Sequence, residues 1–390
     1  MPTEKKVLER KEIPQATSRF YIAGDVSATN ILIGVYSETN ENLDCIFKAN
    51  YNGQRTKDFN TEVLEDILRE TKLKNINAMV LSPAGPINQD GSECIMTNSD
   101  FSVNAKTTKI PTALINDYKA IAYSIAEFKR GKMNLNVLEL LHTNNKLEEA
   151  IPKAPIAIQG PGTGLGTTRL HYDRDKKLYF PFDSEGGHKF LPINPSDEKE
   201  IMISKYLSKK YKSDVPHLEA VLSGRGVEDI FNCLYTNRFL KSEETNPAEV
   251  AEYKKALTET IPTAYIAKKA KEVPGSIYGE TMDFVWKSLG RAFHDLALHE
   301  GAKGGIYGTG GVLMKNIETK IGSGELDKRI ARVIMNEFDN GPTQREWVNK
   351  VPVYAVIDNE IGLKGALACL TTPEYNQRER FYLGENLVNI

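Results

Sequence analysis

The sequence predicts an α/β protein built from two halves that follow one plan. Glycine-rich turns between apolar segments occur twice, at 20–36 and at 156–170, about a third of the chain apart. Each reads as a strand, a tight polar turn and a second strand, and glycine there lets backbone N–H groups converge on an anion. Strand patterns alternate with helical patterns after both turns, which is typical of α/β folds. We therefore expect duplicated halves, each offering a phosphate-binding turn to one cleft.

Length and composition favour a globular protein with two domains. The chain has 390 residues, and its apolar content of 40% and charged content of 26% are ordinary for soluble proteins. The formal charge is −2 with both signs mixed along the chain, which indicates neither a nucleic-acid partner nor an anionic membrane surface. No apolar run approaches the ~20 residues of a membrane span, and the polar N-terminus lacks a signal core.

The cysteines are isolated from one another, at Cys45, Cys94, Cys233 and Cys369. No CxxC pair predicts a zinc site, and four cysteines in a chain of this length do not form a disulfide framework. Reduced thiols in a cytoplasmic protein are the simplest interpretation.

After its turn, the first half continues with strands and helices. A short strand is expected at 44–49, and apolar positions at three- and four-residue spacing predict a helix at 61–68. Residues 78–83 read as a buried strand that runs into a Pro/Gly loop. A further strand at 111–117 ends in two polar residues, and a helix at 118–128 follows at once.

The second half repeats this plan with longer connections. Polar, helix-leaning residues at 130–153 precede it, and charged residues at 238–256 read as a solvated insertion. Its other elements are a hairpin at 155–171, helices between 197 and 300 that include an amphipathic one at 281–299, a strand entering a glycine turn at 304–312, a last clear strand at 351–357 and a helix at 361–371. We expect a mobile tail (1–18), a small α/β domain (19–128 with about 372–390) and a large α/β domain (129–371).

The familiar phosphate-binding motifs are missing. A P-loop needs GxxxxGK[ST], but Met133 follows the only Gly-Lys pair, Gly131-Lys132. The glycines at 160–164 do not place a third glycine where a Rossmann fingerprint needs it, and the protein-kinase HRD and DFG motifs are absent from the sequence. Any phosphate is therefore held by another scheme.

Several polar groups lie where chemistry is expected. Asn116-Asp117 follows a strand, a favoured place for catalytic groups in α/β folds. Glu185 and His188 flank two glycines on an open loop, Glu219 precedes a Ser-Gly-Arg-Gly turn, and Thr97-Asn98 closes a short loop. Together they offer the mixture of donors and acceptors that a polyhydroxylated sugar needs, since each hydroxyl both donates and accepts.

Each group also has a purely structural interpretation. Asp117 serves equally well as a helix N-terminal charge, Glu185 as a surface loop residue, His188 as a structural histidine and Glu219 as a solvated helix residue. Residues 304–311 also suit a helix C-cap and turn. The functional interpretation is favoured because the groups occur in order around two phosphate turns.

In this arrangement the chain resembles the bacterial-type glucokinases of the hexokinase–actin ATPase superfamily, from about Phe20 to Leu370. The resemblance rests on Gly24-Asp25-Val26-x-x-Thr29-Asn30, Thr97-Asn98, Asn116-Asp117, Gly160-x-Gly162-Thr163-Gly164-Leu165-Gly166, Glu185-Gly186-Gly187-His188, Glu219-x-Val221-Leu222-Ser223-Gly224-x-Gly226 and Gly304-Gly305-Ile306. It implies a two-domain, actin-like ATPase fold of duplicated ribonuclease H-like halves with an interdomain cleft. It also implies a homodimer that transfers the γ-phosphoryl group of ATP to the 6-hydroxyl of glucose with Mg²⁺.

The resemblance also implies roles for individual residues. Asp117 corresponds to the residue that takes the proton from the sugar 6-hydroxyl, and Asp25 to the carboxylate near magnesium, commonly through water. The sugar-binding positions are Thr97, Asn98, Asn116, Asp117, Glu185, His188 and Glu219. The nucleotide-binding positions are Gly24, Asp25, Ser27, Ala28, Thr29, Asn30, Gly162, Thr163 and Gly164 for the phosphates and Gly304 and Gly305 for adenosine.

The chain departs from the family pattern in three places. Ser27-Ala28 replaces a usual Gly-Gly pair, so we expect crowding of the β- and γ-phosphates or an altered donor preference. Lys189 to Pro192 replace the cysteine-rich zinc motif of the related repressor/kinase branch, so we expect no structural zinc. A polar head and insertions near 133–150 and 238–256 lengthen the chain.

Three other functions stay open from the sequence. One is a kinase for mannose, fructose or an N-acetylated amino sugar, and another uses ADP, polyphosphate or pyrophosphate as donor. The third is a non-catalytic sugar sensor, which is disfavoured because about 19 N-terminal residues are too few for a helix-turn-helix domain and because Asp117 is present.

Overall fold

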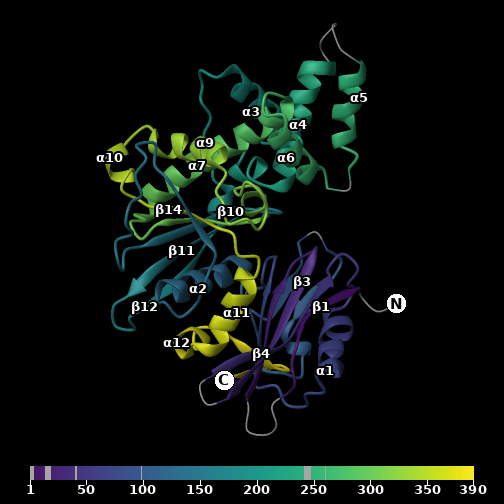
Figure 1. Cartoon of the computed structure of the whole chain (residues 1–390). Coiled ribbons are helices and arrows are strands. Elements are labelled where there is room, and N and C mark those ends of the chain that lie inside the picture. The colour runs from purple at the N-terminus through teal and green to yellow at the C-terminus, as the bar shows by residue number, and fades with distance from the viewer. Residues whose placement is uncertain (1–3, 14–18, 40–41, 98, 241–246, 260) are drawn as a thin grey trace. The chain divides into compact units, whose positions relative to one another are not determined.

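The computed structural model describes residues 4–13, 19–39, 42–97, 99–240, 247–259 and 261–390. Backbone contacts divide the chain into two compact units (Figure 1). Unit 1 comprises Met1–Leu135, Asp173–Pro181 and Asn359–Ile390, and unit 2 comprises Asn136–Tyr172 and Phe182–Asp358.

The strands of unit 1 form a mixed sheet that carries the first glycine-rich turn. In spatial order they are β1 (Lys5–Arg10), β4 (Asn42–Asn52), β3 (Asn30–Thr39), β2 (Arg19–Val26), β5 (Ala78–Pro83), β8 (Thr112–Leu114), β15 (Phe381–Leu383) and β16 (Asn386–Val388). Strands β2, β5 and β8 are parallel, and β5 is buried at every position, as expected for a strand covered on both faces. Their carboxyl ends therefore meet at one edge, where α/β sheets place functional groups.

Two helices of unit 1 pack closely against each other. They are α2 (Asp117–Lys129) and α11 (Ile361–Thr371). A Cβ on Gly365 of α11 would collide with the carbonyl oxygen of Ala120 in α2, and the Ser124 hydroxyl donates to the Ile361 carbonyl at 2.6 Å. Glycine at 365 therefore permits backbone contact between the helices. The smaller elements of unit 1 are η1 (Asn60–Leu64), α1 (Glu65–Thr71), β6 (Glu93–Ile95), β7 (Ser102–Asn104), η2 (Ala105–Thr107) and α12 (Pro373–Asn376).

A second mixed sheet carries the second glycine-rich turn, and its strands belong to unit 2 apart from the residues of β11 and β12 within 173–181. Its spatial order is β12 (Leu178–Ser184), β11 (Leu165–Asp173), β10 (Ile156–Pro161), β13 (Ile306–Gly308), β14 (Val353–Val356) and β9 (Val137–Leu140). Strands β10, β13 and β14 are parallel, while β11 folds back antiparallel to β10.

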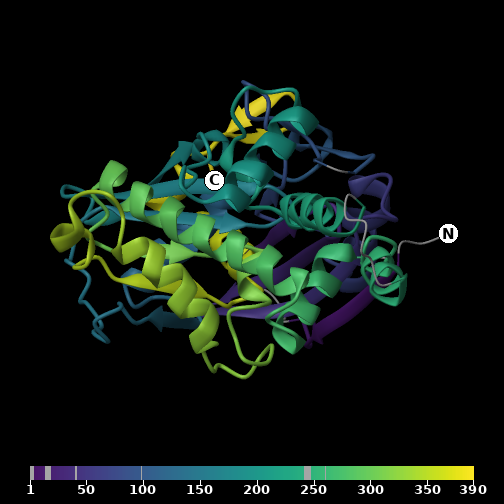
Figure 2. The same ribbon diagram turned by 90° about the horizontal axis from the view of Figure 1, so that it is seen from above.

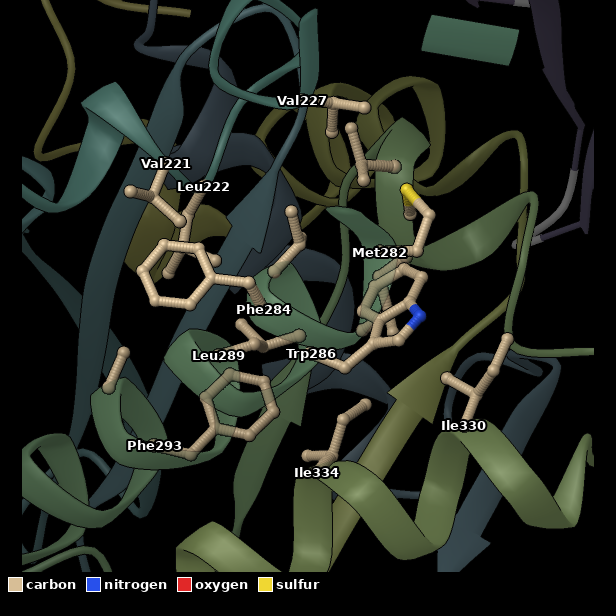
Figure 3. Packing of buried hydrophobic residues seen from close by; sticks show 14 of the residues in the cluster. Val221, Leu222, Val227, Met282, Phe284, Trp286, Leu289, Phe293, Ile330 and Ile334 are labelled. Atoms are coloured by element: carbon tan, nitrogen blue, oxygen red, sulfur yellow. The ribbon is translucent and has the colours of Figure 1, made fainter. Parts of the chain in front are cut away.

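Helices supply most of the core of unit 2. They are η3 (Gly186–His188), α3 (Glu198–Tyr211), η4 (Leu218–Ala220), α4 (Gly224–Tyr235), η5 (Thr236–Leu240), α5 (Pro247–Ala256), α6 (Pro262–Glu272), α7 (Ile277–Glu300), α8 (Gly311–Met314), α9 (Lys328–Asp339) and α10 (Arg345–Val348). The long helices α7 and α9 lie side by side (Figure 2). Trp286 of α7 is 1% exposed and packs among Met282, Ile330 and Ile334 (Figure 3). This apolar contact fixes the helical layer on which the sheet rests.

Most predicted elements are present in the structure. The predicted α/β class is confirmed, and so are the strands at 44–49 and 78–83 and the helix at 118–128. The helix predicted at 281–299 begins earlier, at Ile277, because buried apolar residues extend its pattern toward the N-terminus. The predicted last strand at 351–357 is present as β14, but the chain adds β15 and β16 after it.

Two segments differ from the sequence predictions. Lys5–Arg10 of the expected mobile tail forms β1, which pairs antiparallel with β4, whereas 1–3 and 14–18 lie outside the described residues. The helix-leaning segment 130–153 contains the strand β9 instead, because Val137–Leu140 pairs with the edge of β14. Pairing with β4 overrides the polar sequence of β1, whereas β9 is a short apolar stretch inside a polar segment.

The units divide the chain at other points than the expected domains. Helix α11 groups with unit 1, whereas the sequence placed 129–371 in one large domain. Residues 129–135 and 173–181 also group with unit 1. In the expected insertion at 238–256, α5 is described and 241–246 lie outside the described residues.

No helix within the described ranges is both long and apolar enough to span a bilayer.

The contact between α2 and α11 predicts a strong effect at Gly365. Gly365→Ala should lower the free energy of unfolding by about 1–3 kcal/mol, because a methyl group must push two backbones apart. The loss should appear although alanine favours helix over glycine by about 1 kcal/mol. Thermal and urea unfolding measure it, with Gly275→Ala as control, since nothing lies within 4 Å of a Cβ at that exposed loop position. Equal stability of both variants would contradict the close contact.

Candidate active site

The first glycine-rich turn, between β2 and β3, exposes backbone donors. The Ser27 hydroxyl donates to the Asn30 carbonyl at 2.9 Å and accepts from the Asn30 N–H at 3.2 Å. A Cβ on Gly53 would lie 2.5 Å from the carbonyl oxygen of Ser27 and 2.7 Å from that of Ala28, so both carbonyls face Gly53. Because C=O and N–H point in opposite directions in a trans peptide, the N–H groups of Ala28 and Thr29 point away from it. No acceptor among the described residues takes them, which suits an anion.

Other predicted residues of this turn have supporting positions. Gly24 lies within the sheet, where a Cβ would approach the side chains of Ile33 and Leu81 to 2.6 Å. Gly24 therefore allows packing rather than contact with a ligand. The side chain of Asn30 donates to the Thr29 hydroxyl at 3.2 Å, and both residues are exposed at the tip.

Asp25, at the carboxyl end of β2, is a half-buried carboxylate without a hydrogen-bond donor among the described residues. A Cβ on Gly362, in the first turn of α11, would collide with it, so glycine there makes room for the carboxylate. Burial, with the negative charge of Asp117 as second cause, raises the pKa of Asp25 to about 7. A desolvated carboxylate next to a like charge is a place where a cation is stabilised.

Asn116 and Asp117 follow β8 and begin α2. The Asn116 side chain caps the helix by accepting from the N–H groups of Tyr118 at 2.9 Å and Lys119 at 3.3 Å. Asn116 therefore fills the N-cap position, and Asp117 lies in the first turn of α2, where it also fits the interpretation as a helix N-terminal charge. One Asp117 oxygen accepts from the Tyr118 N–H at 2.9 Å. Burial raises the pKa of Asp117 to about 6, although hydrogen bonds from neighbouring groups act in the opposite direction.

Thr97 lies in the loop that follows β6, and its N–H donates to the Ala84 carbonyl just after β5 at 3.0 Å. Its side chain is exposed. The predicted partner Asn98 lies outside the described residues. Three neighbouring strand ends of unit 1 thus lie beside predicted site residues. Asp25 lies at the carboxyl end of β2, Ala84 after β5 holds Thr97, and Asn116-Asp117 follow β8.

The second glycine-rich turn, between β10 and β11, repeats the exposed donors of the first. The Gly162 N–H donates to the Gly164 carbonyl at 2.8 Å, and the Gly162 carbonyl accepts from the Gly224 N–H at 2.9 Å. The N–H groups of Thr163 and Gly164 have no acceptor in the described part of the chain. Both hairpins therefore present two consecutive unpaired N–H groups, as expected for phosphate-binding turns.

Glu219 is held against the second turn by Leu165, the residue that follows the turn. One Glu219 oxygen, Oε2, accepts from the Leu165 N–H at 2.9 Å. A Cβ on Gly164 would lie 2.7 Å from the same oxygen, so glycine is needed for the approach. The interpretation of Glu219 as a solvated helix residue is therefore wrong, and Oε1 is left as an acceptor.

The loop with Glu185 and His188 also contacts Leu165, at its carbonyl oxygen. A Cβ on Gly187 would collide with the Leu165 carbonyl oxygen, which brings the short helix η3 directly onto the start of β11. The Glu185 and His188 side chains are exposed. In unit 2 the structure thus brings together the second turn, Glu219 and this loop.

His217 was missed by the sequence analysis. It lies two residues before Glu219 in extended backbone, and its ring centroid is 5.5 Å from that of His188. Burial lowers the pKa of His217. No local pattern identifies His217, because Glu219 already lies in the short helix η4 and the approach of His217 to His188 comes from backbone pairing of two loops.

Gly304 and Gly305 lie at the wrong end of β13 for the second turn. The Gly304 N–H donates to the Pro155 carbonyl before β10 begins, whereas the turn follows β10 at its carboxyl end. The glycines beside the turn are instead Gly310 and Gly311, which follow β13. Gly310 has φ +84°, and a Cβ there would lie 2.5 Å from the Pro161 carbonyl oxygen. The rule that ligands bind at the carboxyl ends of strands was the signal that identifies this pair.

A family model described as glucokinase matches residues 22–373. The chain belongs to the glucokinase family. A glucokinase of Nostoc sp. is 26% identical over 359 residues, which cover 89% of this chain and 98% of that protein. The family assignment confirms the resemblance, and it makes the chain an enzyme, a sugar kinase.

Solved structures support the fold. A glucokinase from Balamuthia mandrillaris in complex with glucose superposes with a TM-score of 0.70 at 18% identity, covering 91% of this chain and 94% of that one. A glucokinase from Streptomyces griseus in complex with glucose and AMPPNP gives a TM-score of 0.52 at 17% identity, covering 89% and 97%. The predicted actin-like ATPase fold is thereby confirmed for this family member.

The raised pKa of Asp25 predicts that its negative charge lowers stability. The folded state holds the proton up to about pH 7, whereas an unfolded aspartate releases it near pH 3.8. Ionisation therefore lowers the free energy of unfolding as pH rises between these values. Without nucleotide or Mg²⁺, Asp25→Asn should be more stable than the parent at pH 8, by on the order of 3 kcal/mol. The gain should fall to less than half at pH 5.

Urea unfolding at both pH values measures this difference. Asp44→Asn is the matched control, since Asp44 is an exposed aspartate on β4 of the same unit. An Asp25→Asn variant that is no more stable than the parent at pH 8 would show that the carboxylate is well solvated.

Proposed function

We propose that this protein is an ATP-dependent glucokinase, which transfers the γ-phosphoryl group of ATP to the 6-hydroxyl of D-glucose and yields glucose 6-phosphate and ADP. The observation that carries the proposal is the family match over 22–373, together with a desolvated Asp117 at the carboxyl end of a parallel strand. The similar glucokinase structures with glucose and with AMPPNP support both substrates.

Asp117 is the proposed general base. Its folded-state pKa of about 6 leaves it ionised at neutral pH, yet makes it more basic than an ordinary aspartate. Phosphoryl transfer passes through a loose transition state, so the carboxylate mainly orients the hydroxyl and accepts its proton late. The Tyr118 N–H and the Asn116 side chain hydrogen-bond to the carboxylate and so orient it.

The sugar hydroxyls are held by Asn116, Glu185, His188 and Glu219, with Thr97 and Asn98 as further candidates. Glu219 is the best positioned, because the Leu165 N–H fixes Oε2 and leaves Oε1 to accept. A site that pairs buried polar groups with hydroxyls rejects a deoxy analogue strongly, since the analogue leaves a polar group unpaired.

The residues of unit 1 fit a magnesium ion at Asp25. Mg²⁺ prefers carboxylate and water oxygens. The Asp25 carboxylate has no hydrogen-bond donor among the described residues, and the negative charge of Asp117 disfavours its ionised form unless a cation is near. Bound there with ATP, magnesium would neutralise charge that develops on the phosphates. We assign Asp25 the role of holding it, through water.

The phosphates are assigned to the two turns, through the N–H groups of Ala28, Thr29, Thr163 and Gly164. Ser27 contributes the hydrogen bonds that close the first turn. For adenosine we propose Gly310 and Gly311 in place of Gly304 and Gly305, because only the former pair lies beside the second turn.

The resemblance further supports a homodimer, and the isolated cysteines support a cytoplasmic protein with reduced thiols.

Turnover measurements test the proposed function. With glucose and Mg–ATP the protein should release ADP and glucose 6-phosphate, and a panel of mannose, fructose, N-acetylated amino sugars and other donors should be used less well. Asp117→Asn should lower kcat by about 10²–10⁴-fold at an almost unchanged KM for glucose. The asparagine oxygen can still accept from the Tyr118 N–H, so the fold should persist.

Asp58→Asn is the matched control, because Asp58 is an exposed aspartate that accepts from the Thr61 N–H at 2.7 Å at another helix start of unit 1. Wild-type turnover by Asp117→Asn would rule out Asp117 as the base.

The pKa of Asp117 also predicts an acid limb in the activity. Protonated Asp117 cannot accept the hydroxyl proton, so kcat/KM for glucose at saturating Mg–ATP should fall below about pH 6, approaching tenfold per pH unit. Above that pH the carboxylate is ionised and the profile should level off. Steady-state rates between pH 5 and 8 measure this limb, and a flat profile down to pH 5 would contradict the assignment.

A further inference from the structure

His188, His217 and Glu219 form a cluster of metal-ligating groups in unit 2. One nitrogen from each ring and one carboxylate oxygen all lie within 4.8 Å of one another. His188 is exposed, whereas His217 and Glu219 are half-buried. The cluster therefore has an open side toward solvent.

Backbone pairing holds the three residues in register. The Leu191 N–H donates to the Pro216 carbonyl at 2.9 Å, and the Leu218 N–H donates to the Lys189 carbonyl at 2.8 Å. These bonds clamp the residues after His188 to those around His217. Glu219 is held separately by the Leu165 N–H. The cluster is thus built from positioned segments rather than from freely moving surface chains.

We propose that His188, His217 and Glu219 bind a divalent transition-metal ion of the Zn²⁺ class. Imidazole nitrogen and carboxylate oxygen are ordinary zinc ligands at about 2.0–2.2 Å, which in a tetrahedron places ligand atoms about 3.4 Å apart. Rotation of the exposed His188 side chain closes the remaining gap. Two imidazoles select against Mg²⁺, which prefers oxygen ligands, so this site is distinct from that of Asp25.

The ion would be an inhibitor that competes with sugar, and this consequence rests on the proposed function. Two of its three ligands, His188 and Glu219, are the groups assigned to sugar hydroxyls. Metal and sugar therefore cannot use them together. His217 has no assigned role toward sugar, so it is the residue that creates metal affinity without serving the reaction.

Direct binding to the whole protein tests the site without sugar or nucleotide. Zn²⁺ is titrated against a chromophoric chelator in the presence of wild type, His217→Gln or His299→Gln. His299 is the matched control, since it is an exposed histidine whose Nε2 lies 3.8 Å from Glu300, a pair that lies outside the three-ligand cluster. Wild type and His299→Gln should bind one ion alike, and His217→Gln should bind at least about 100-fold more weakly.

Two results would overturn the proposed site. One is a wild type that does not compete with the chelator, and the other is a His217→Gln variant that binds as tightly as wild type. Thermal unfolding checks that His217→Gln is folded, and its melting temperature should stay close to that of wild type.

Kinetics test the competition. In excess Mg–ATP, Zn²⁺ should raise the KM for glucose without lowering kcat in wild type, and a chelator should reverse the effect. His217→Gln should lose this inhibition. Inhibition that glucose does not relieve would overturn the competition. A protein that binds Zn²⁺ as expected but phosphorylates no sugar would instead contradict the proposed function.

Discussion

The peptide groups of Leu165 organise the polar groups of unit 2. Its N–H holds Glu219 at 2.9 Å, and its carbonyl oxygen lies directly against Gly187 in the loop of Glu185 and His188. Leu165 is also the first residue of β11, paired with Pro161 across the second turn. The sheet therefore sets the positions of both loops and of the phosphate turn at once. Side chains that a rigid strand positions in this way keep their geometry more precisely than side chains held by loops alone.

The glycines around Leu165 serve close approach more than unusual backbone angles. Side chains at Gly164 and Gly187 would strike Glu219 and Leu165, and one at Gly160 would strike the Thr309 carbonyl oxygen. Each glycine thus removes an obstacle between two segments that are distant in sequence. The glycines of such a motif are therefore needed both for these close contacts and for the exposed N–H groups.

The sequence was sufficient where local chemistry and function coincide. Asp117 and the two turns lie at strand ends, so their positions follow from the strand pattern and the parallel sheet. The strand β9 was missed because it is only four residues long, Val137–Leu140, and lies between polar stretches, so its pairing with β14 is not visible in the local sequence. His217 was equally hidden, since its value depends on His188, which the chain brings close through backbone pairing of two loops. The segment 304–311 contains glycine at both ends of one strand, and only the sheet register shows that Gly310 and Gly311, rather than Gly304 and Gly305, lie beside the second turn.

The side chains of Ser27 and Ala28 are compatible with exposed N–H groups in the first turn. A turn with side chains at these positions needs space for them and for its carbonyls. The Ser27 hydroxyl turns back onto Asn30, and the Ala28 methyl is 9% exposed. Gly53, directly after β4, leaves room for the carbonyl oxygens of Ser27 and Ala28, since a Cβ there would lie only 2.5 and 2.7 Å from them. Glycine is therefore needed at 53, behind the turn, and the N–H groups of Ala28 and Thr29 point away from it.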